Sequence, residues 1–157
     1  MELQPEEPPA ADFVERFAAT MVASGMPRMA SRVFALLLSQ DDGSATSTEL
    51  ALALQASPAA ISGAVRYLIQ LHLITRAHRP GERRDVYRLL SDHWYEMVGN
   101  RDHELEQWAR LSREGVDVVG VDTRAGARLE ETARFFEFLI NEMPSVLERW
   151  RSEARDG

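Results

Sequence analysis

Arginine side chains are concentrated in one segment of an otherwise acidic chain. The 157 residues carry a net charge of −7, and all 18 basic residues are arginines. Residues 57–91 hold six of these arginines against two acidic residues, so the segment carries +4 and the remainder −11. Because a phosphate backbone responds to the local field, this segment suits a nucleic acid. Guanidinium groups are also forked donors that match phosphate oxygens and guanine edges.

The same segment opens with a helix whose outer face is unusually bare. Ser57-Pro58 is typical of an N-cap and a first helical residue, and we expect the helix to run to His72. Its large apolar residues recur at helical spacing and must face inward: Ile61, Val65, Leu68 and Ile69. The opposite face carries small or polar residues: Ala59, Ala60, Ser62, Gly63 and Arg66. Tyr67 is the large side chain on this face.

Glycine inside a helix costs about 1 kcal/mol relative to alanine, so a purely structural surface helix would not favour Gly63. Small residues permit close approach of another backbone, here the wall of a DNA groove. The alternative is tight packing against another helix. Arg66, two turns into the helix, is the best single candidate for a base or phosphate contact. Ser57 and Ser62 would rather hold phosphates, helped by the helix N-terminus.

Two short strands are predicted after this helix, at 73–77 and 85–89. The loop between them, HRPGERR, contains a Pro-Gly turn signal and three arginines, Arg79, Arg83 and Arg84. At the tip of a hairpin these arginines are badly placed to stabilise the fold and well placed to reach a phosphate or a minor groove. The alternative is a solvated hairpin whose arginines pair with the two acidic residues of the segment.

The elements before the basic segment should hold it in place. Thr46 or Ser47 can cap a short helix over TELALALQ, with Glu49 in its first turn. The leucines of this run also satisfy the period of a strand, but its alanines, its cap and the following Ser-Pro favour a helix. Helix, turn, helix, strand, loop and strand then follow one another. This is the order of a winged helix-turn-helix, a DNA-reading device.

Two further helices are predicted closer to the N-terminus. Residues 1–11 are rich in proline and glutamate, so we expect a flexible arm. A helix capped by Asp12 should then run to about Gly25. Pro27 suits the first turn of the next helix, which should end at 41–43. Apolar residues cover so much of that helix that it should lie in the core.

Helices also follow the basic segment. Ser91-Asp92 is a cap signal for a long helix that Gly115 should end. The run VDVVGVDT alternates like a strand but has no obvious partner, so we expect a packed loop. The last helix should begin near Thr123, and Pro144 should break or kink it.

The run SPAAISGAVRYLIQLHLITRAHRPGERRDVYRL, at 57–89, resembles the winged-helix core of MarR-type bacterial transcription regulators. The branch it looks most like is the GbsR-like one, which has a long helix and a C-terminal helix after the wing. The resemblance is clearest over 30–90 and rests on several features together. These are the Ser-Pro opening, the small Ser-Gly pair, the Leu-Ile after the helix, and the arginine-rich hairpin that ends in Tyr-Arg-Leu.

The resemblance implies a homodimer whose N- and C-terminal helices intertwine, with two recognition helices in successive major grooves and two wings on flanking minor grooves. By this resemblance, the DNA-contacting positions of the recognition helix are Ser57, Ala59, Ser62, Gly63 and Arg66. Those of the wing are Arg79, Arg83 and Arg84. The implied function is sequence-specific transcriptional regulation by binding double-stranded DNA at a pseudo-palindromic operator.

The expected fold is mainly α with a small β-hairpin wing, a winged helix-turn-helix flanked by dimerisation helices. Its expected parts are the arm at 1–11, an N-terminal helix with the DNA-binding region at 12–91, and a helical dimerisation region at 92–157. The first and last helices depart from the commonest pattern of the family. Which helices form the dimer interface therefore stays open.

Other classes of function fit less well. The sequence has no phosphate-binding loop, no G-x-G-x-x-G, no H-E-x-x-H and no nucleophile with an evident base, so we expect no enzyme. It has no cysteine, and His93 and His103 lack the i, i+4 spacing of a helical metal pair, so we expect no cofactor or metal. No apolar run approaches the ~20 residues that span a bilayer, and no signal peptide is evident. We expect a soluble, cytoplasmic protein without membrane contact.

Two alternatives remain open. The aromatic residues of the last helices either pack in the core and interface, which we favour, or line a cavity for a small-molecule effector: Trp94, Trp108, Trp150, Phe135, Phe136 and Phe138. The second function is a winged-helix protein-interaction module without DNA binding. A basic wing and a bare helix face argue against it.

Overall fold

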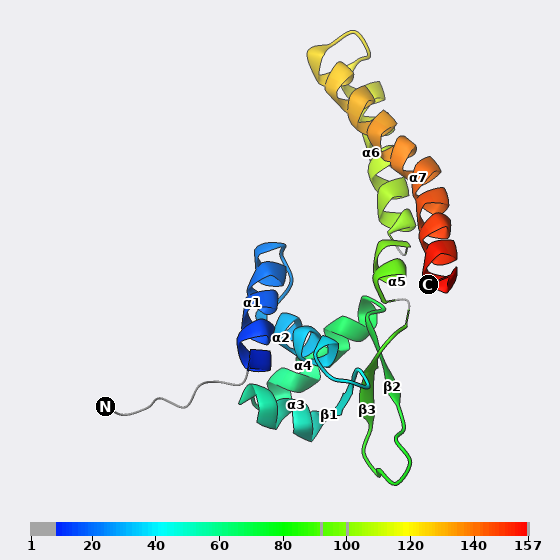
Figure 1. Cartoon of the computed structure of the whole chain (residues 1–157). Helices are drawn as coiled ribbons and strands as arrows, with labels where there is room; N and C mark the ends of the chain where they lie inside the picture. Colours follow the sequence, from blue (N-terminus) through cyan, green and yellow to red (C-terminus); the bar gives the residue numbers. More distant parts are fainter. Residues whose placement is uncertain (1–8, 92, 100, 157) are drawn as a thin grey trace. The chain divides into compact units, whose positions relative to one another are not determined.

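A computed structural model of the chain describes residues 9–91, 93–99 and 101–156. It is mainly helical with one small antiparallel sheet, as the sequence predicts, and it divides into two compact units at His93 and Trp94. Helices α1–α4 and strands β1–β3 belong to unit 1, and the helices after the sheet make up unit 2 (Figure 1). None of the described helices is long and apolar enough to cross a membrane.

The first helix, α1 (Pro9–Ala23), packs on α2 (Arg28–Leu38). Residues 1–8 of the expected arm lie outside the described residues, whereas residues 9–11 are already helical. The expected cap at Asp12 is therefore wrong: Asp12 lies within the first turn and pairs with Arg16 one turn later, at 3.2 Å. A carboxylate in the first turn is still favourable, because it faces the positive end of the helix dipole.

Helix α2 forms the centre of unit 1, which confirms its predicted place in the core. Val33, Phe34 and Leu37 are fully buried, and α2 contacts α1, α3, α4 and β3. Arg32, on the same helix, binds the Glu15 carboxylate of α1 at 2.7 Å. It also donates to the Leu54 carbonyl of α3 at 3.2 Å, so one side chain joins three helices.

The run TELALALQ is helical, which settles the choice between helix and strand. Helix α3 (Ser47–Leu54) begins after Thr46, whose hydroxyl accepts a hydrogen bond from the Glu49 amide while the Glu49 carboxylate accepts one from the Thr46 amide. This reciprocal capping box satisfies two amides that the first turn would otherwise leave unpaired. Of the leucines that suggested a strand, Leu50 and Leu54 are buried and Leu52 is 80% exposed.

Helix α4 (Pro58–Gln70) follows with the predicted cap, because the Ser57 hydroxyl accepts a hydrogen bond from the Ala60 amide at 3.2 Å. Its buried face contains Ile61, Val65 and Leu68, as the helical spacing predicts, whereas Ile69 of the predicted set is only half-buried. The turn between α3 and α4 begins at Gln55, whose φ of 50° is left-handed. Helix-turn-helix geometry is therefore reached with a strained non-glycine residue.

The two predicted strands are present as β2 (Ile74–Ala77) and β3 (Val86–Leu89), paired antiparallel with Ile74 opposite Leu89. A third strand, β1 (Ser44–Thr46), pairs with the other side of β3 and gives the order β1-β3-β2. Strand β1 is not evident from the sequence, because three residues are too few to show alternation. All three residues of β1 are buried.

Unit 2 contains α5 (His93–Gly99, mostly in this unit), α6 (Asp102–Val119) and α7 (Arg124–Asp156). Several expectations are wrong here, beginning with the one long helix expected after Ser91, which is two helices, α5 and α6. Gly115 does not end a helix but lies inside α6, and residues 116–119 of the expected packed loop are helical. Of the two effects expected of Pro144, a break or a kink, the break is wrong, because α7 runs continuously through the proline.

Glycines set how closely α6 and α7 approach each other. A Cβ at Gly115 would lie 3.0 Å from Leu129 of α7. At Gly126 a Cβ would lie 2.1 Å from the carbonyl oxygen of Gly120, so the turn between the helices needs a glycine there. Arg113 of α6 then binds the Glu137 carboxylate with two nitrogens, at 2.9 and 2.8 Å, and also contacts Glu130.

Candidate nucleic-acid interface

The outer face of α4 is open, as expected for a recognition helix. Ala59, Ser62, Gly63 and Arg66 are exposed, and Ser57 at the cap is exposed as well. A Cβ built at Gly63 would meet no atom within 4 Å. The alternative explanation of Gly63, tight packing against another helix, is therefore wrong within the described part of unit 1. Packing within unit 1 therefore does not explain why this position is glycine and not alanine.

Three arginines of the basic segment keep their guanidinium groups available. Within residues 9–91, Arg66 on α4, Arg83 in the wing loop and Arg88 on β3 make no hydrogen bond or ion pair, and all three are exposed. Arg76 of β2 stands 3.8 Å from Asp85, and both side chains are half exposed or more. An ion pair this long and exposed contributes little. The acidic neighbours of the wing thus neutralise only a part of its charge.

Arg84 has a neutral partner. Its Nη1 donates to the Thr48 hydroxyl in the first turn of α3, at 2.5 Å. The side chain is exposed, so its charge still faces solvent while one nitrogen is held. Arg84 and Arg83 therefore project from the same loop, but only Arg84 is tied to the helical part of unit 1.

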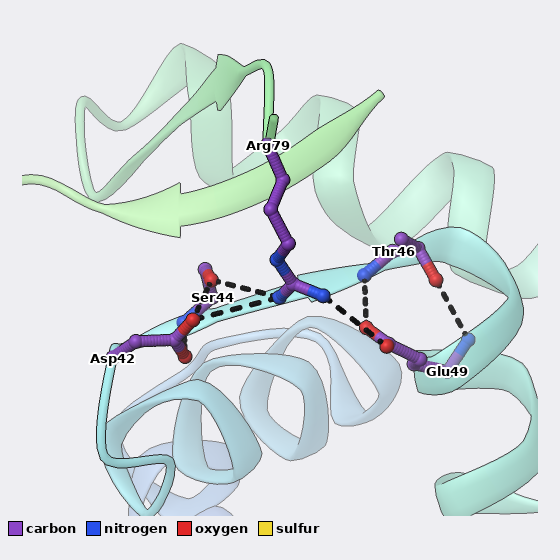
Figure 2. A network of polar contacts seen from close by, with 5 residues as sticks. All are labelled: Asp42, Ser44, Thr46, Glu49 and Arg79. Carbon is purple, nitrogen blue, oxygen red and sulfur yellow. Dashed lines mark hydrogen bonds and ion pairs between the residues drawn. The ribbon is translucent and has the colours of Figure 1, made fainter. Parts of the chain in front are cut away.

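Arg79 lies differently from the other arginines of the wing. Figure 2 shows its side chain reaching back to β1 and α3 instead of outward. Nη2 donates to the Ser44 hydroxyl at 3.1 Å and approaches Asp42 at 3.5 Å, while Nη1 is 3.4 Å from Glu49. We expected the arginines of this loop to be badly placed to stabilise the fold, and this is wrong for Arg79. Its partners lie more than 29 residues away in the sequence, so its contacts join distant parts of unit 1.

The carboxylates around Arg79 are held in their charged form. The hydroxyl and amide of Ser44 lower the pKa of Asp42 below its ordinary value, and the charge of Arg79 adds to this. The Thr46 amide lowers the pKa of Glu49, again with a contribution from Arg79. The two carboxylates stay ionised near neutral pH, so Arg79 is held between two negative charges.

Comparison with known proteins agrees with this arrangement. A model of the MarR family matches residues 24–85, and a model of the MmpR5-like MarR family transcriptional regulators matches residues 92–153. The HTH-type transcriptional regulator MmpR5 of Mycobacterium tuberculosis is 29% identical over 145 residues, which cover 92% of this chain and 88% of that protein. The chain is a MarR-family transcriptional regulator. A crystal structure of a transcriptional regulator superposes with a TM-score of 0.79 at 28% identity, over 92% of this chain and 99% of that one.

Membership of the MarR family confirms the resemblance drawn from residues 57–89, and this is a family of DNA-binding regulators. The GbsR-like branch remains a prediction, since the model that matches the helices after the wing is the MmpR5-like one. In this MarR regulator, α3 and α4 form the helix-turn-helix and β2 and β3 the wing. The described residues contain no group of three or more acidic or histidine side chains that could hold a metal.

The acidic partners of Arg79 cannot be recognised from the sequence around the wing. Glu49 was recognised as part of a capping box, but one of its oxygens binds the Thr46 amide and the other faces Arg79. Asp42 and Ser44 were assigned no role near the wing. The only local signal was the sequence D-x-S, in which an aspartate can bind the amide two residues on, as Asp42 does at 3.1 Å. The long-range contact with Arg79 leaves no such local signal.

Proposed function

We propose that this MarR regulator recognises a pseudo-palindromic operator as a homodimer, with α4 in the major groove and the wing on the adjacent minor groove. The observation that carries the proposal is the outer face of α4, which is open around Gly63 and offers the unpaired Arg66. A helix that is capped and packed on one face, yet bare on the other, suits insertion into a groove.

The proposed contacts follow from side-chain length and charge. Arg66 would read a base edge, since its guanidinium can bind two acceptors of guanine at once. Ser57 and Ser62 would hold phosphates, with amides of the first turn of α4 adding to the contact. Ala59 and Gly63 would let the groove wall approach the helix.

In the wing, Arg83 and Arg84 would contact phosphates or enter the minor groove. Their contribution to affinity is the release of counterions, which does not depend on base sequence. The rest of the chain carries −11 and would be repelled by DNA, so binding through any other face is disfavoured. The charge distribution thus orients the regulator on its operator.

The homodimer is supported by the surface of unit 2. Its two long helices bury mainly small residues between them, whereas large apolar side chains stay in solvent: Trp108 and Trp150 at 57%, Phe135 at 56% and Phe138 at 58% exposure. Exposed aromatic residues on this scale mark a surface that another chain covers. Two-fold symmetry would then place two copies of α4 about one helical turn of DNA apart, roughly 10 bp. A small-molecule effector remains a prediction.

The test begins with selection of a duplex from a random library by the wild-type chain, followed by titrations at several salt concentrations on the selected and on a random duplex. Arg66→Ala should weaken binding to the selected duplex by about 1–3 kcal/mol and relax the base preference at one position. The double variant Arg83→Ala/Arg84→Ala should weaken binding to both duplexes and flatten the salt dependence.

Light scattering on the same protein measures the oligomeric state. A dimer that selects no duplex even at low salt would refute DNA binding and favour the protein-interaction module. A monomer that selects a single half-site would refute the dimer. If Arg66→Ala leaves affinity and base preference unchanged, α4 does not read the operator through this residue.

A further inference from the structure

We propose that Arg79 is a positioning residue instead of a DNA contact: it fastens the wing to the helix-turn-helix, so that both meet DNA as one rigid body. The DNA part of this inference rests on the proposed function. Its structural part does not, because it concerns only contacts within unit 1.

The partners of Arg79 belong to three different pieces of unit 1. Asp42 lies in the loop before β1, Ser44 begins β1, and Glu49 lies in the first turn of α3 (Figure 2). In the sheet, β1 and β2 are the two edges with β3 between them. Arg79 follows β2, so its side chain connects one edge of the sheet to the other and to the helix beyond.

Arg79 also begins the turn of the wing. Its carbonyl oxygen accepts a hydrogen bond from the Glu82 amide at 2.9 Å, and Gly81 within this turn has a φ of +86°. Gly81 supplies the positive φ that the third position of a type II turn requires, and Pro80 stands at the second position, where proline is common. Fixing the side chain of Arg79 therefore fixes the first residue of the turn, beyond which lies Arg83.

A second tie lies on the other side of the loop. Arg84 binds the Thr48 hydroxyl, and Thr48 is the residue next to Glu49 in α3. Both sides of the wing loop are thus attached to the same turn of α3. This helix leads directly into the turn that precedes α4, so the attachment couples the wing to the recognition helix.

Charge decides between positioning and DNA contact for Arg79. Its guanidinium stands within 3.5 Å of Asp42 and 3.4 Å of Glu49, and its side chain is only 32% exposed. Together the three groups carry one net negative charge. If Arg79 moved to a phosphate, both carboxylates would lose their cation beside the DNA. Arg83, by contrast, has no partner among residues 9–91 and can meet a phosphate without such a loss.

Salt dependence separates the two roles. On the selected duplex, Arg79→Ala should weaken binding while the slope of log K against log salt stays as in wild type. A lost phosphate contact in each protomer of the proposed homodimer would reduce that slope by about 1.8, which is about 0.9 for each contact. Arg83→Ala is the matched control from the same loop and should reduce it. A slope that falls for Arg79→Ala as it does for Arg83→Ala overturns the proposal.

A double-mutant cycle tests the partner. Glu49→Gln removes the charge beside Arg79 but keeps an oxygen for the Thr46 amide, since glutamine also serves at this position of a capping box. The change in Kd that Glu49→Gln causes should differ about two- to tenfold between the wild-type and Arg79→Ala backgrounds. Equal changes in both backgrounds overturn the proposal, because the general effect of each charge on DNA cancels in the cycle.

Hydrogen exchange tests the structural part without DNA. In Arg79→Ala the Glu82 amide and the amides of β2 and β3 should exchange faster than in wild type, while those of α7 stay unchanged. Arg79→Lys, which keeps the charge but loses the fork, should fall between the two. If the wild-type chain selects no duplex, the proposed function fails and exchange alone decides. Faster exchange in the wing then supports the positioning role, and unchanged exchange refutes it.

Discussion

Replacing Gly63 by alanine should stabilise the protein and weaken its binding to DNA at the same time. Gly63 lies within α4, and an added Cβ would meet no atom within 4 Å. The methyl group therefore carries no steric cost, and alanine gains about 1 kcal/mol over glycine inside a helix. The free energy of unfolding should rise by this amount, which corresponds to an increase of about 2–8 °C in the unfolding midpoint.

Affinity should change in the opposite direction. If the groove wall approaches the backbone of α4 at Gly63, the methyl group occupies space that DNA needs. Overpacking of one methyl group costs about 1–3 kcal/mol, or roughly 5- to 150-fold in Kd.

The measurement combines urea and thermal unfolding with titration of the selected duplex. Gly99→Ala is a matched control, since it adds the same methyl group in unit 2, at an ordinary 3.5 Å from Leu147. It should leave DNA affinity unchanged. A loss of stability in Gly63→Ala would show that the outer face of α4 is not open. A gain in stability with unaltered affinity would show that DNA does not approach the helix at this point.

Three further substitutions or conditions test the fold. Gly126→Ala should destabilise the protein by about 1–3 kcal/mol in urea, because its Cβ would lie 2.1 Å from the Gly120 oxygen, and a midpoint equal to that of wild type would contradict the tight turn. Gln55→Gly should raise the free energy of unfolding by about 0.5–1 kcal/mol, because the strain of a left-handed glutamine exceeds the extra chain entropy that glycine loses on folding. A lower free energy of unfolding in this variant would show that Gln55 is not strained. Because folding lowers the pKa values of Asp42 and Glu49, both carboxylates stabilise the folded state at pH values above their ordinary pKa values of 3.8 and 4.5. This stabilisation is lost as the pH falls through the pKa values of the folded state. Between pH 6 and pH 3 the free energy of unfolding should therefore fall less in the Asp42→Asn/Glu49→Gln variant than in wild type. Equal decreases would show that the two carboxylates do not contribute to stability.

Local signals in the sequence were sufficient for the helix-turn-helix. The Ser57-Pro58 cap and the Thr46 to Glu49 box are interactions within four residues, so their residue types determine the geometry almost alone. The apolar spacing of α4 likewise fixed its inner face, and with it the outer face at Ser62 and Gly63. What the sequence could predict about the candidate site was therefore the recognition helix.

In unit 2, local sequence signals do not determine where the helices end, because packing between α6 and α7 overrides them. Pro144 deletes one hydrogen bond of α7, yet the helix is held on both sides of it. Before the proline, Glu137 is bound by Arg113 of α6, and after it Arg151 lies over the ring of Tyr95 at 3.9 Å. Tertiary contacts on both sides outweigh the local cost of proline. Gly115 resembled a helix end, whereas its small size serves the close approach of Leu129.

The wing shows why residue type and position in a loop do not assign a role to an arginine. Arg79 and Arg83 lie four residues apart in one basic loop and looked equivalent in the sequence. They differ because the sheet brings Asp42, Ser44 and Glu49 to Arg79, whereas no such partner reaches Arg83 among residues 9–91. The register of β1 on β3 places Thr46 opposite Val86, at the end of the sheet where the wing loop leaves it. β1 was the strand that its own three residues could not reveal, so the separation of the two arginines could be recognised only once the fold was known.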